Sequence, residues 1–510
     1  MKRNAVLRLC LALALTPRWA WADSLPDVLA RVRAATGHAS VARSADGWEM
    51  RGTARFSGLD ERYSLRFMPS GAFRETYQGR LNQTTGFDGK TAWRVDYSGM
   101  PRILELQDRE TALLVAEALT GRWLAGNSGM DAAVDGEQPD PTQVRLLFRL
   151  KGGVLPARLT VSRADWLPQS LTYTTPDGPE VWAFSDYRRE HGRAYAHRLT
   201  HEVNGLKDVV TVRSLRPAAP APALFAPVTR RPNDTRFAPN IPPQVPLLRT
   251  RTGHLLVRPR LDGRDVGWFI LDSGAGVMVI DPGAAAALRL PSFGHQANSG
   301  AGAALQTSFC RGRTFALGPL TLDRPLYVQI DLSAATKAFH VPAAGVCGYD
   351  LFSRAVLEVD QGRRHLALRD PRRYRLTRGR WEPFRLDGGV ACVRCRFEGN
   401  REGLFSLDTG SNGTVDFLAL AVERLGLLKG RATAAVQGRG VGGVFQKRRG
   451  RLGWFEIGGH RFQNPEADFV LTKQGDLSGL YETGNVGGKF LDPFTLVFDY
   501  AHHRIAFVQK

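Results

Sequence analysis

The feature that most limits how this chain can fold is a pattern that occurs twice in its C-terminal half. Trp268–Ala275 reads Trp-Phe-Ile-Leu-Asp-Ser-Gly-Ala, and Leu404–Ser411 reads Leu-Phe-Ser-Leu-Asp-Thr-Gly-Ser. In each copy a short apolar run leads into an aspartate, a hydroxyl residue and a glycine. An internal repeat of this kind predicts two related structural units, each of which carries one copy of the pattern.

A second pair of matching segments follows the first at a distance. Gly345–Phe352 reads Gly-Val-Cys-Gly-Tyr-Asp-Leu-Phe, and Gly484–Leu491 reads Gly-Asn-Val-Gly-Gly-Lys-Phe-Leu. Each continues into an apolar, strand-like run that reaches an aspartate, in Val356–Asp360 and in Leu496–Tyr500. Because both segments recur in the same order, the repeat extends over a whole lobe and is more than a short motif.

Asp272 and Asp408 are the candidate catalytic residues of this repeat. Hydrolysis of a peptide bond without a metal needs one carboxylate to take a proton from water and one neutral carboxyl to polarise the carbonyl. Two carboxyls held about 3 Å apart share a proton because both cannot be ionised together. We therefore expect one aspartate from each lobe, with Gly274 and Gly410 allowing the backbone to approach the carboxylates closely.

An apolar run, Asp-Ser/Thr-Gly and a later apolar-apolar-Gly resemble the signature of the aspartic peptidase family, in both its retropepsin-like and its pepsin-like forms. The resemblance implies a mainly β fold with a pair of β-barrel lobes at residues 248–378 and 379–510. It also implies an aspartic-type endopeptidase that uses Asp272 and Asp408 without metal or other cofactor. In that family the hydroxyls of Ser273 and Thr409 would hold the two loops together.

Two glycine-rich stretches lie between the matching segments, at Asn298–Gly302 and at Gly438–Gly443. By position they resemble the flap hairpins that close over a substrate in this family, so Gly300, Gly302, Gly440 and Gly442 are predicted to contact substrate. The second stretch is not a dinucleotide-binding loop, because strand-like sequence follows it in place of a helix. Neither stretch carries the tyrosine of pepsin-like flaps.

Residues 23–216 predict a separate antiparallel β domain. Apolar and polar residues alternate in several short runs, and a helical pattern covers residues 109–123. Gly86–Trp93, Asp165–Pro168 and Phe184–Tyr187 resemble segments of the periplasmic lipoprotein-carrier family, which sorts outer-membrane lipoproteins. That resemblance implies a half-open barrel for acyl chains, hence a lipid or lipoprotein partner; a docking or inhibitory domain is the alternative.

Two histidines of this domain, His197 and His201, lie in a strand-like run. Four residues along a strand span about 13 Å, which is too far for them to share a metal ion. We therefore expect surface histidines.

The remaining segments bear on location. In residues 1–22, Lys2, Arg3 and Arg8 lead into a short apolar run that is followed by Ala20-Trp21-Ala22, which predicts a signal peptide cleaved after Ala22. A periplasmic or secreted protein without a transmembrane segment is expected. Residues 217–247 are rich in proline and predict a semi-rigid linker.

Four cysteines then remain, at positions 310, 347, 392 and 395. Their spacing leaves open whether they form disulfides or structural thiols, and the Cys392–Cys395 spacing leaves a metal or redox site as a weaker alternative.

The formal net charge is +20, and the basic residues are scattered along the chain. No motif or basic patch indicates nucleic-acid binding. The sequence as a whole thus favours an exported, monomeric aspartic endopeptidase that acts on proteins or peptides. The alternative is an envelope lipid- or lipoprotein-binding protein with an inactive or accessory peptidase-like half.

Overall fold

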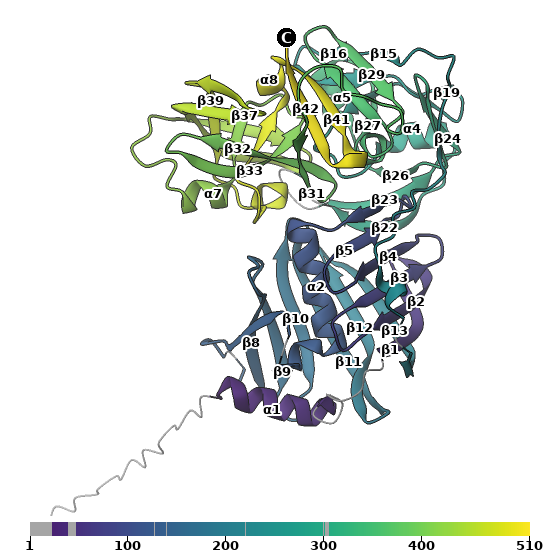
Figure 1. Ribbon diagram of the computed structural model, residues 1–510, viewed down its shortest axis with the longest axis vertical. Coiled ribbons are helices and arrows are strands. Elements are labelled where there is room, and N and C mark those ends of the chain that lie inside the picture. Colours follow the sequence, from purple (N-terminus) through teal and green to yellow (C-terminus); the bar gives the residue numbers. More distant parts are fainter. Residues whose placement is uncertain are drawn as a thin grey trace, which may run out of the picture.

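The computed structural model describes residues 23–38, 47–126, 128–138, 140–219, 221–298, 300 and 305–510. The predicted signal peptide, residues 1–22, and the predicted flap residue Gly302 lie outside them. Within the described residues the chain forms an N-terminal β domain and a two-lobed C-terminal domain stacked on it (Figure 1). No helix of the described part is long and apolar enough to cross a membrane.

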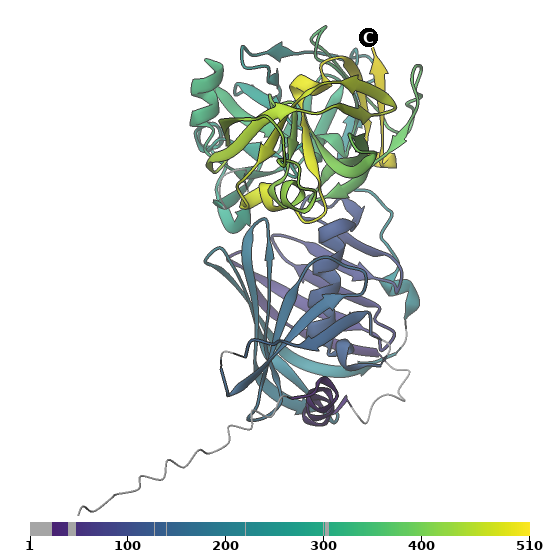
Figure 2. The ribbon, with the colours of Figure 1, turned by 90° about the vertical axis from the view of Figure 1, so that its left-hand side faces the viewer.

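The N-terminal domain is one antiparallel sheet of 13 strands that curves around a helix (Figure 2). In sheet order the strands are β6 (Pro101–Ile103), β5 (Ala92–Val95), β4 (Gln83–Phe87), β3 (Phe73–Gln78), β2 (Leu59–Phe67), β1 (Gly47–Phe56), β13 (Leu206–Ala218), β12 (Arg193–Val203), β11 (Gly178–Glu190), β10 (Pro168–Thr175), β9 (Ala157–Ser162), β8 (Gln143–Leu150) and β7 (Met130–Val134). The helices are α1 (Leu25–Thr36), α2 (Leu106–Thr120) and the 3-10 turn η2 (Arg122–Leu124).

One face of this sheet is buried, as alternation along its strands shows. In β8, Val144, Leu146 and Phe148 are buried and the residues between them are more exposed. Helix α2 lies inside the curve, and 11 of its residues are buried, which an amphipathic surface helix would not show. The predicted half-barrel with a helix over residues 109–123 is therefore confirmed, with the helix beginning three residues earlier, at Leu106.

The predicted surface location of two histidines is wrong. His197 is fully buried and its Nδ1 lies 3.1 Å from the carbonyl oxygen of Val212, while His201 is largely buried beside Glu180. Both lie in β12, as the strand-like pattern indicated. Residues of equal parity along a strand share a face, and Leu199, between them, faces the interior. Parity therefore placed both histidines inside.

The proline-rich segment between the domains has secondary structure of its own. It contains α3 (Pro222–Phe225), β14 (Thr235–Phe237) and β15 (Gln244–Pro246). Both strands pair with strands of the C-terminal domain, and Phe225 accepts a hydrogen bond of 2.8 Å at its carbonyl from the indole of Trp93. The segment thus packs against both domains.

Lobe 1, residues 248–378, is built on two sheets. The larger has the order β16 (Leu248–Arg249), β17 (Leu255–Val257), β20 (Trp268–Leu271), β27 (Ala343–Cys347), β21 (Val279–Ile280), β26 (Leu326–Gln329), β23 (Leu305–Arg311) and β22 (Phe293–Asn298). The smaller has the order β14, β25 (Leu320–Asp323), β24 (Thr314–Leu317), β18 (Arg260–Leu261) and β19 (Arg264–Asp265). Its helices are α4 (Pro282–Ala287), α5 (Ser333–Phe339) and α6 (Tyr349–Phe352).

Lobe 2, residues 379–510, has one sheet of ten strands. Nine follow the order β35 (Ala434–Gly440), β36 (Gly443–Arg451), β39 (Glu466–Val470), β34 (Val415–Phe417), β40 (Gly484–Gly487), β33 (Arg401–Asp408), β32 (Val390–Phe397), β37 (Trp454–Ile457) and β38 (His460–Gln463), and β31 (Arg385–Asp387) pairs with β32. Its helices are α7 (Ala419–Arg424), η3 (Gly475–Ser478), α8 (Gly488–Leu491) and η4 (Tyr500–His502).

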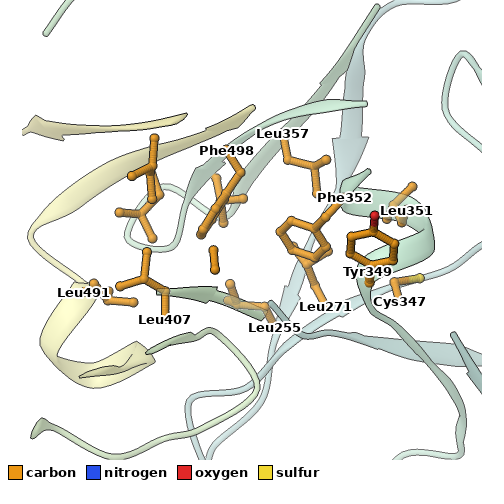
Figure 3. Close-up of a cluster of buried hydrophobic side chains, with 14 of the residues drawn as sticks. Leu255, Leu271, Cys347, Tyr349, Leu351, Phe352, Leu357, Leu407, Leu491 and Phe498 are labelled. Atoms are coloured by element: carbon orange, nitrogen blue, oxygen red, sulfur yellow. The ribbon is translucent and has the colours of Figure 1, made fainter. Parts of the chain in front are cut away.

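A third sheet joins the lobes. Its order is β15, β29 (His365–Arg369), β28 (Val356–Asp360), β41 (Phe494–Asp499), β42 (Arg504–Gln509) and β30 (Glu382–Pro383). Strand β28 of lobe 1 and β41 of lobe 2 are adjacent in it. The apolar core is likewise continuous: Leu271 and Leu407, which precede the two aspartates, belong to one buried cluster with Leu357 and Phe498 (Figure 3). The lobes are therefore a single folded body.

Candidate active site

The repeat places its two aspartates by the same strand arrangement in both lobes. Strand β20 pairs in parallel with β27, and β33 pairs in parallel with β40. In each lobe a further short strand, β21 or β34, pairs antiparallel with that same partner. Asp272 follows β20 directly, and Asp408 is the last residue of β33. The two halves of the sequence repeat therefore form two equivalent loops.

The hydroxyl residues after the aspartates join these loops. Ser273 Oγ donates to the carbonyl of Leu407 over 2.8 Å, and Thr409 Oγ1 donates to the carbonyl of Leu271 over 2.9 Å. Each hydroxyl also accepts the backbone N–H of the other residue, at 3.0 and 3.1 Å. Both side chains are 1% exposed, so these four bonds are shielded from water.

The glycines bring each loop against the carboxyl of the other lobe. A Cβ atom on Gly274 would lie 2.8 Å from Asp408 Cγ, and one on Gly410 would lie 2.2 Å from Asp272 Cγ. Neither glycine has a left-handed φ. Space for the opposite carboxyl, more than backbone conformation, is thus what requires glycine here. The Gly274 N–H also donates to Asp272 Oδ1 over 2.8 Å.

The two carboxyl groups share a hydrogen bond, and both are partly buried where they line the cavity. Burial, and then the negative charge of Asp408, raise the pKa of Asp272 well above its usual range. Burial also raises the pKa of Asp408, but hydrogen bonds, first from Asn485, oppose that rise. The pair can therefore hold one proton, and Asp272 is the better place for it.

Asn485 is a functional candidate to which the sequence pattern assigned no role. Its Nδ2 donates to Asp408 Oδ2 over 3.1 Å. Its Oδ1 accepts a hydrogen bond of 3.1 Å from Ser406 Oγ, which turns the amide N–H₂ toward the aspartate. The equivalent positions in lobe 1 are Val346 and Ile270, which lie in an apolar cluster. A polar residue where the repeat has an apolar one was the available signal.

The predicted flaps are partly described. Gly438–Gly443 spans the turn between β35 and β36, with Gly442 at a φ of 87°. Gly300 follows β22, and a Cβ on it would lie 2.5 Å from the carbonyl oxygen of Val441. Gly300 and Gly440 line the same cavity as both aspartates. The described parts of the two stretches therefore meet each other beside the aspartates.

The aspartates lie in a cavity of about 880 Å³. Its wall includes Asp272 and Asp408 together with Glu75 and Trp182 of the N-terminal domain. The cavity inside the curved sheet is therefore continuous with the space above the aspartates.

The cysteines do not form a reactive pair. Cys310, Cys347, Cys392 and Cys395 are all buried and free. Burial raises the pKa of each thiol, that of Cys310 to about 11, so the thiols stay protonated at neutral pH. Among the described residues, no group of three or more Cys, His, Asp or Glu side chains is arranged to hold a metal ion.

Comparison with known families locates the repeat. The family model described as aspartyl protease matches the chain twice, over residues 257–351 and over residues 393–487. Each lobe carries one match, and each match contains one of the two aspartates. The predicted resemblance to aspartic peptidases is confirmed for these two segments. A comparison with curated protein sequences finds no match.

Solved structures similar to the chain come from both groups that the sequence resembles. An aspartic proteinase from Irpex lacteus is 12% identical, with a TM-score of 0.33, and the match covers 52% of this chain and 97% of that chain. A retropepsin-like aspartic protease from Rickettsia conorii is 18% identical (TM-score 0.20; 26% and 98% covered). A LolA superfamily protein from Nitrosomonas europaea is 10% identical (TM-score 0.29; 40% and 98% covered).

Proposed function

We propose that this protein is an aspartic endopeptidase in which Asp272 and Asp408 activate a water molecule between them. The observation that carries the proposal is the carboxyl pair at the junction of the lobes, with a shared hydrogen bond and the pKa of both groups raised. An acid and a base are then present together in one site. The symmetrical Ser273 and Thr409 bonds keep the pair in place before substrate arrives.

The reaction follows from the different surroundings of the two groups. Asp408, whose ionised form accepts the Asn485 amide, takes a proton from water as the oxygen attacks the peptide carbonyl. Asp272 gives its proton to the carbonyl oxygen, which produces a neutral tetrahedral diol. Asp408 then passes its proton to the amide nitrogen while Asp272 takes one from a diol hydroxyl. The C–N bond breaks and the starting protonation state returns.

A digest of an unfolded protein at mildly acidic pH tests this proposal. Wild-type protein is expected to cleave it and to be inhibited by a pepstatin-like transition-state mimic. Asp272→Asn and Asp408→Asn, purified in parallel, are the matched inactive variants. Cleavage that survives in both variants would reject the mechanism, because each lacks one of the two required groups.

A second function, binding of a lipid or lipoprotein, is favoured by the apolar part of the cavity. Helix α2 lines it with Val115, Ala116 and Leu119, and β2 and β3 add Leu65 and Phe73. An acyl chain could lie along such a wall. Acyl chains found by mass spectrometry in organic extracts of the purified full chain would support this function, and extracts without them would count against it.

Export remains a prediction from residues 1–22, as does the monomeric state. The N-terminal residue of protein recovered from the envelope of an expressing bacterium is expected to be Asp23. An intact N-terminus on protein recovered from the cytoplasm would contradict export.

A further inference from the structure

The N-terminal domain is firmly docked on the two lobes. The backbone N–H of His295, in β22, donates to the carbonyl of Ser57 over 2.8 Å. Tyr97 packs edge-on against Phe309, with ring centroids 5.7 Å apart. At the other side, helix α2 meets β31, as Figure 1 shows. The wall that the N-terminal domain adds to the cavity is therefore a fixed surface and not a gap between mobile parts.

That wall is polar and aromatic where strands β3 and β10–β12 form it. Glu75 Oε1 accepts hydrogen bonds from the hydroxyls of Tyr63 and Tyr77, at 3.1 and 3.3 Å. Glu180 accepts the hydroxyl of Tyr173 over 2.9 Å. Trp182 lines the cavity nearby. Carboxyl groups set among aromatic rings attract cations through both charge and the ring faces.

The formal charge of the residues that line the cavity is opposite to that of the whole chain. Among the described residues that line the cavity, 13 are Asp or Glu and three are Arg, whereas the whole chain carries +20. A low-dielectric wall of one sign concentrates ligands of the other sign. A basic peptide would be repelled by the positive outer surface of the protein but attracted once it entered the cavity.

Some of these carboxyl groups are already neutralised. His201 is paired with Glu180 over 2.8 Å and has a pKa raised to about 9, by its hydrogen bonds to Asp208 and Glu180 against the lowering effect of burial. Its positive charge balances one of those two carboxylates. Arg94 and Arg102 similarly face Asp108.

Other carboxyl groups of the wall form no ion pair of their own among the described residues, and cations such as Arg94 act on them only from a distance. Glu75 is held by tyrosine hydroxyls, and its partial burial raises its pKa. At the domain junction Asp387 and Glu482 share a hydrogen bond, and burial raises the pKa of both. All three line the cavity. A bound ammonium or guanidinium group would let them ionise, which is the energetic basis for selecting such a ligand.

We propose that the N-terminal domain forms part of the substrate site, and that its wall around Glu75, together with Asp387 and Glu482, binds lysine or arginine side chains of the peptide to be cleaved. This inference rests on the proposed peptidase function, whose site it extends. The substrate class is then a basic peptide segment that reaches from the aspartates into the curved sheet.

Cleavage kinetics on the full chain provide the first test. Each series of internally quenched peptides would vary a single position, which would carry Lys, Arg, norleucine or Glu in turn. We expect kcat/KM for Lys and Arg to exceed that for norleucine about tenfold at one or more positions, as for a buried charge-assisted bond. Glu75→Gln keeps the acceptor for both tyrosines and should remove most of that preference through KM, with kcat unchanged.

Glu202→Gln is the matched control, because Glu202 is a half-exposed residue that pairs with Lys207 and does not line the cavity. It removes the same charge and should leave the preference intact. Equal cleavage of all four peptide types by wild-type protein would overturn the inference and leave the peptidase proposal standing. A Glu75→Gln effect on kcat alone would also overturn it.

Binding to the Asp408→Asn variant separates the inference from catalysis. A fluorescent Lys-rich peptide with a benzophenone at one end should bind more weakly as salt is added, and should cross-link to β3, β11 or β12. Cross-links found only in the two lobes would overturn the inference. Binding that added salt does not weaken, and that an acylated peptide reproduces with equal affinity, would also overturn it. Asp387→Asn is a second variant should Glu75→Gln unfold. If no peptide is cleaved but this binding occurs, the peptidase proposal alone fails.

Discussion

Lobe 1 and lobe 2 carry the same loop, yet they treat their aspartates differently. In lobe 2 the Ser406 and Asn485 side chains form a polar pair that ends on Asp408. In lobe 1 the equivalent residues, Ile270 and Val346, belong to an apolar cluster. The duplication thus preserved the frame that holds the carboxyls, while one polar substitution in each of two adjacent strands makes them unequal. Symmetry of the backbone does not imply symmetry of the chemistry.

The largest expected effect is on the rate of cleavage, and it comes from the aspartate that each lobe contributes. Asp272→Asn and Asp408→Asn should each lower the rate of peptide cleavage by about 10⁴-fold, because each removes one of the two proton-transfer groups. Single-turnover rates on one quenched peptide would measure this. Loss of activity in one variant alone would break the equivalence of the two lobes in catalysis.

A buried arginine tests how lobe 1 is joined to the N-terminal domain. Arg354 is paired with Asp234 at 2.7 Å and Asp350 at 3.4 Å, and it donates to the carbonyl of Ser98 in the N-terminal domain. Arg354→Met should lower the free energy of unfolding by about 3–5 kcal/mol, since it leaves the carboxylates of Asp350 and Asp234 without their ion-pair partner. Urea unfolding would measure it. Lys489→Met in lobe 2 changes a largely exposed side chain and is expected to cost less than about 1 kcal/mol.

The hydrogen bonds of the Ser273 and Thr409 hydroxyls should contribute equally to the stability of the protein. Ser273→Ala and Thr409→Val each remove a buried donor and a buried acceptor. We expect each to lower the free energy of unfolding by about 2–4 kcal/mol, at 1–2 kcal/mol for each group left unpaired. Thermal unfolding of both variants, side by side, would measure this. A clear loss of stability in only one of the two variants would show that the hydroxyl of a single lobe stabilises the junction.

The smallest effect concerns the asymmetry itself. Asn485→Val gives lobe 2 the side chain of lobe 1 and removes a hydrogen bond that lowers the pKa of Asp408. That pKa should then rise, so the acidic limb of the pH–rate profile should move about one pH unit toward neutral. Ser406→Ala, which only releases the amide, should move it less in the same direction. An unchanged acidic limb in Asn485→Val would remove the case for unequal aspartates.

The site was predictable from sequence to the extent that its chemistry resides in short contiguous motifs. Asp-Ser-Gly and Asp-Thr-Gly each specify a carboxyl, a hydroxyl and a small residue, and their duplication indicates that they meet. Asn485 was within a recognised segment, but its role depends on the register Ser406↔Asn485 between two parallel strands, which no local pattern gives. The burial of His197 could have been predicted, because its place in the alternating pattern of β12 puts it on the same face as Leu199.

The cavity shared by the two domains, in contrast, could not be predicted from sequence motifs. Glu75 and Asp387 are far apart in the chain and belong to separately folded units, and they line one space only because those units dock in one orientation. Alternating patterns predicted the curved sheet itself. Packing between two domains depends on surface complementarity, which has no signature of spacing or composition along the chain.

The sheet that joins the lobes also supports the first aspartate loop. Its central strands are β28 of lobe 1 and β41 of lobe 2, and β41 pairs on its other side with β42. Tyr500, between β41 and β42, reaches the backbone of the first loop: its hydroxyl donates to the carbonyl of Ser273 over 3.4 Å. A residue of lobe 2 thus supports the backbone beside the aspartate of lobe 1. Moving the lobes apart would have to break the β28–β41 ladder, so the spacing of the two carboxyl groups is set by a frame that both lobes share.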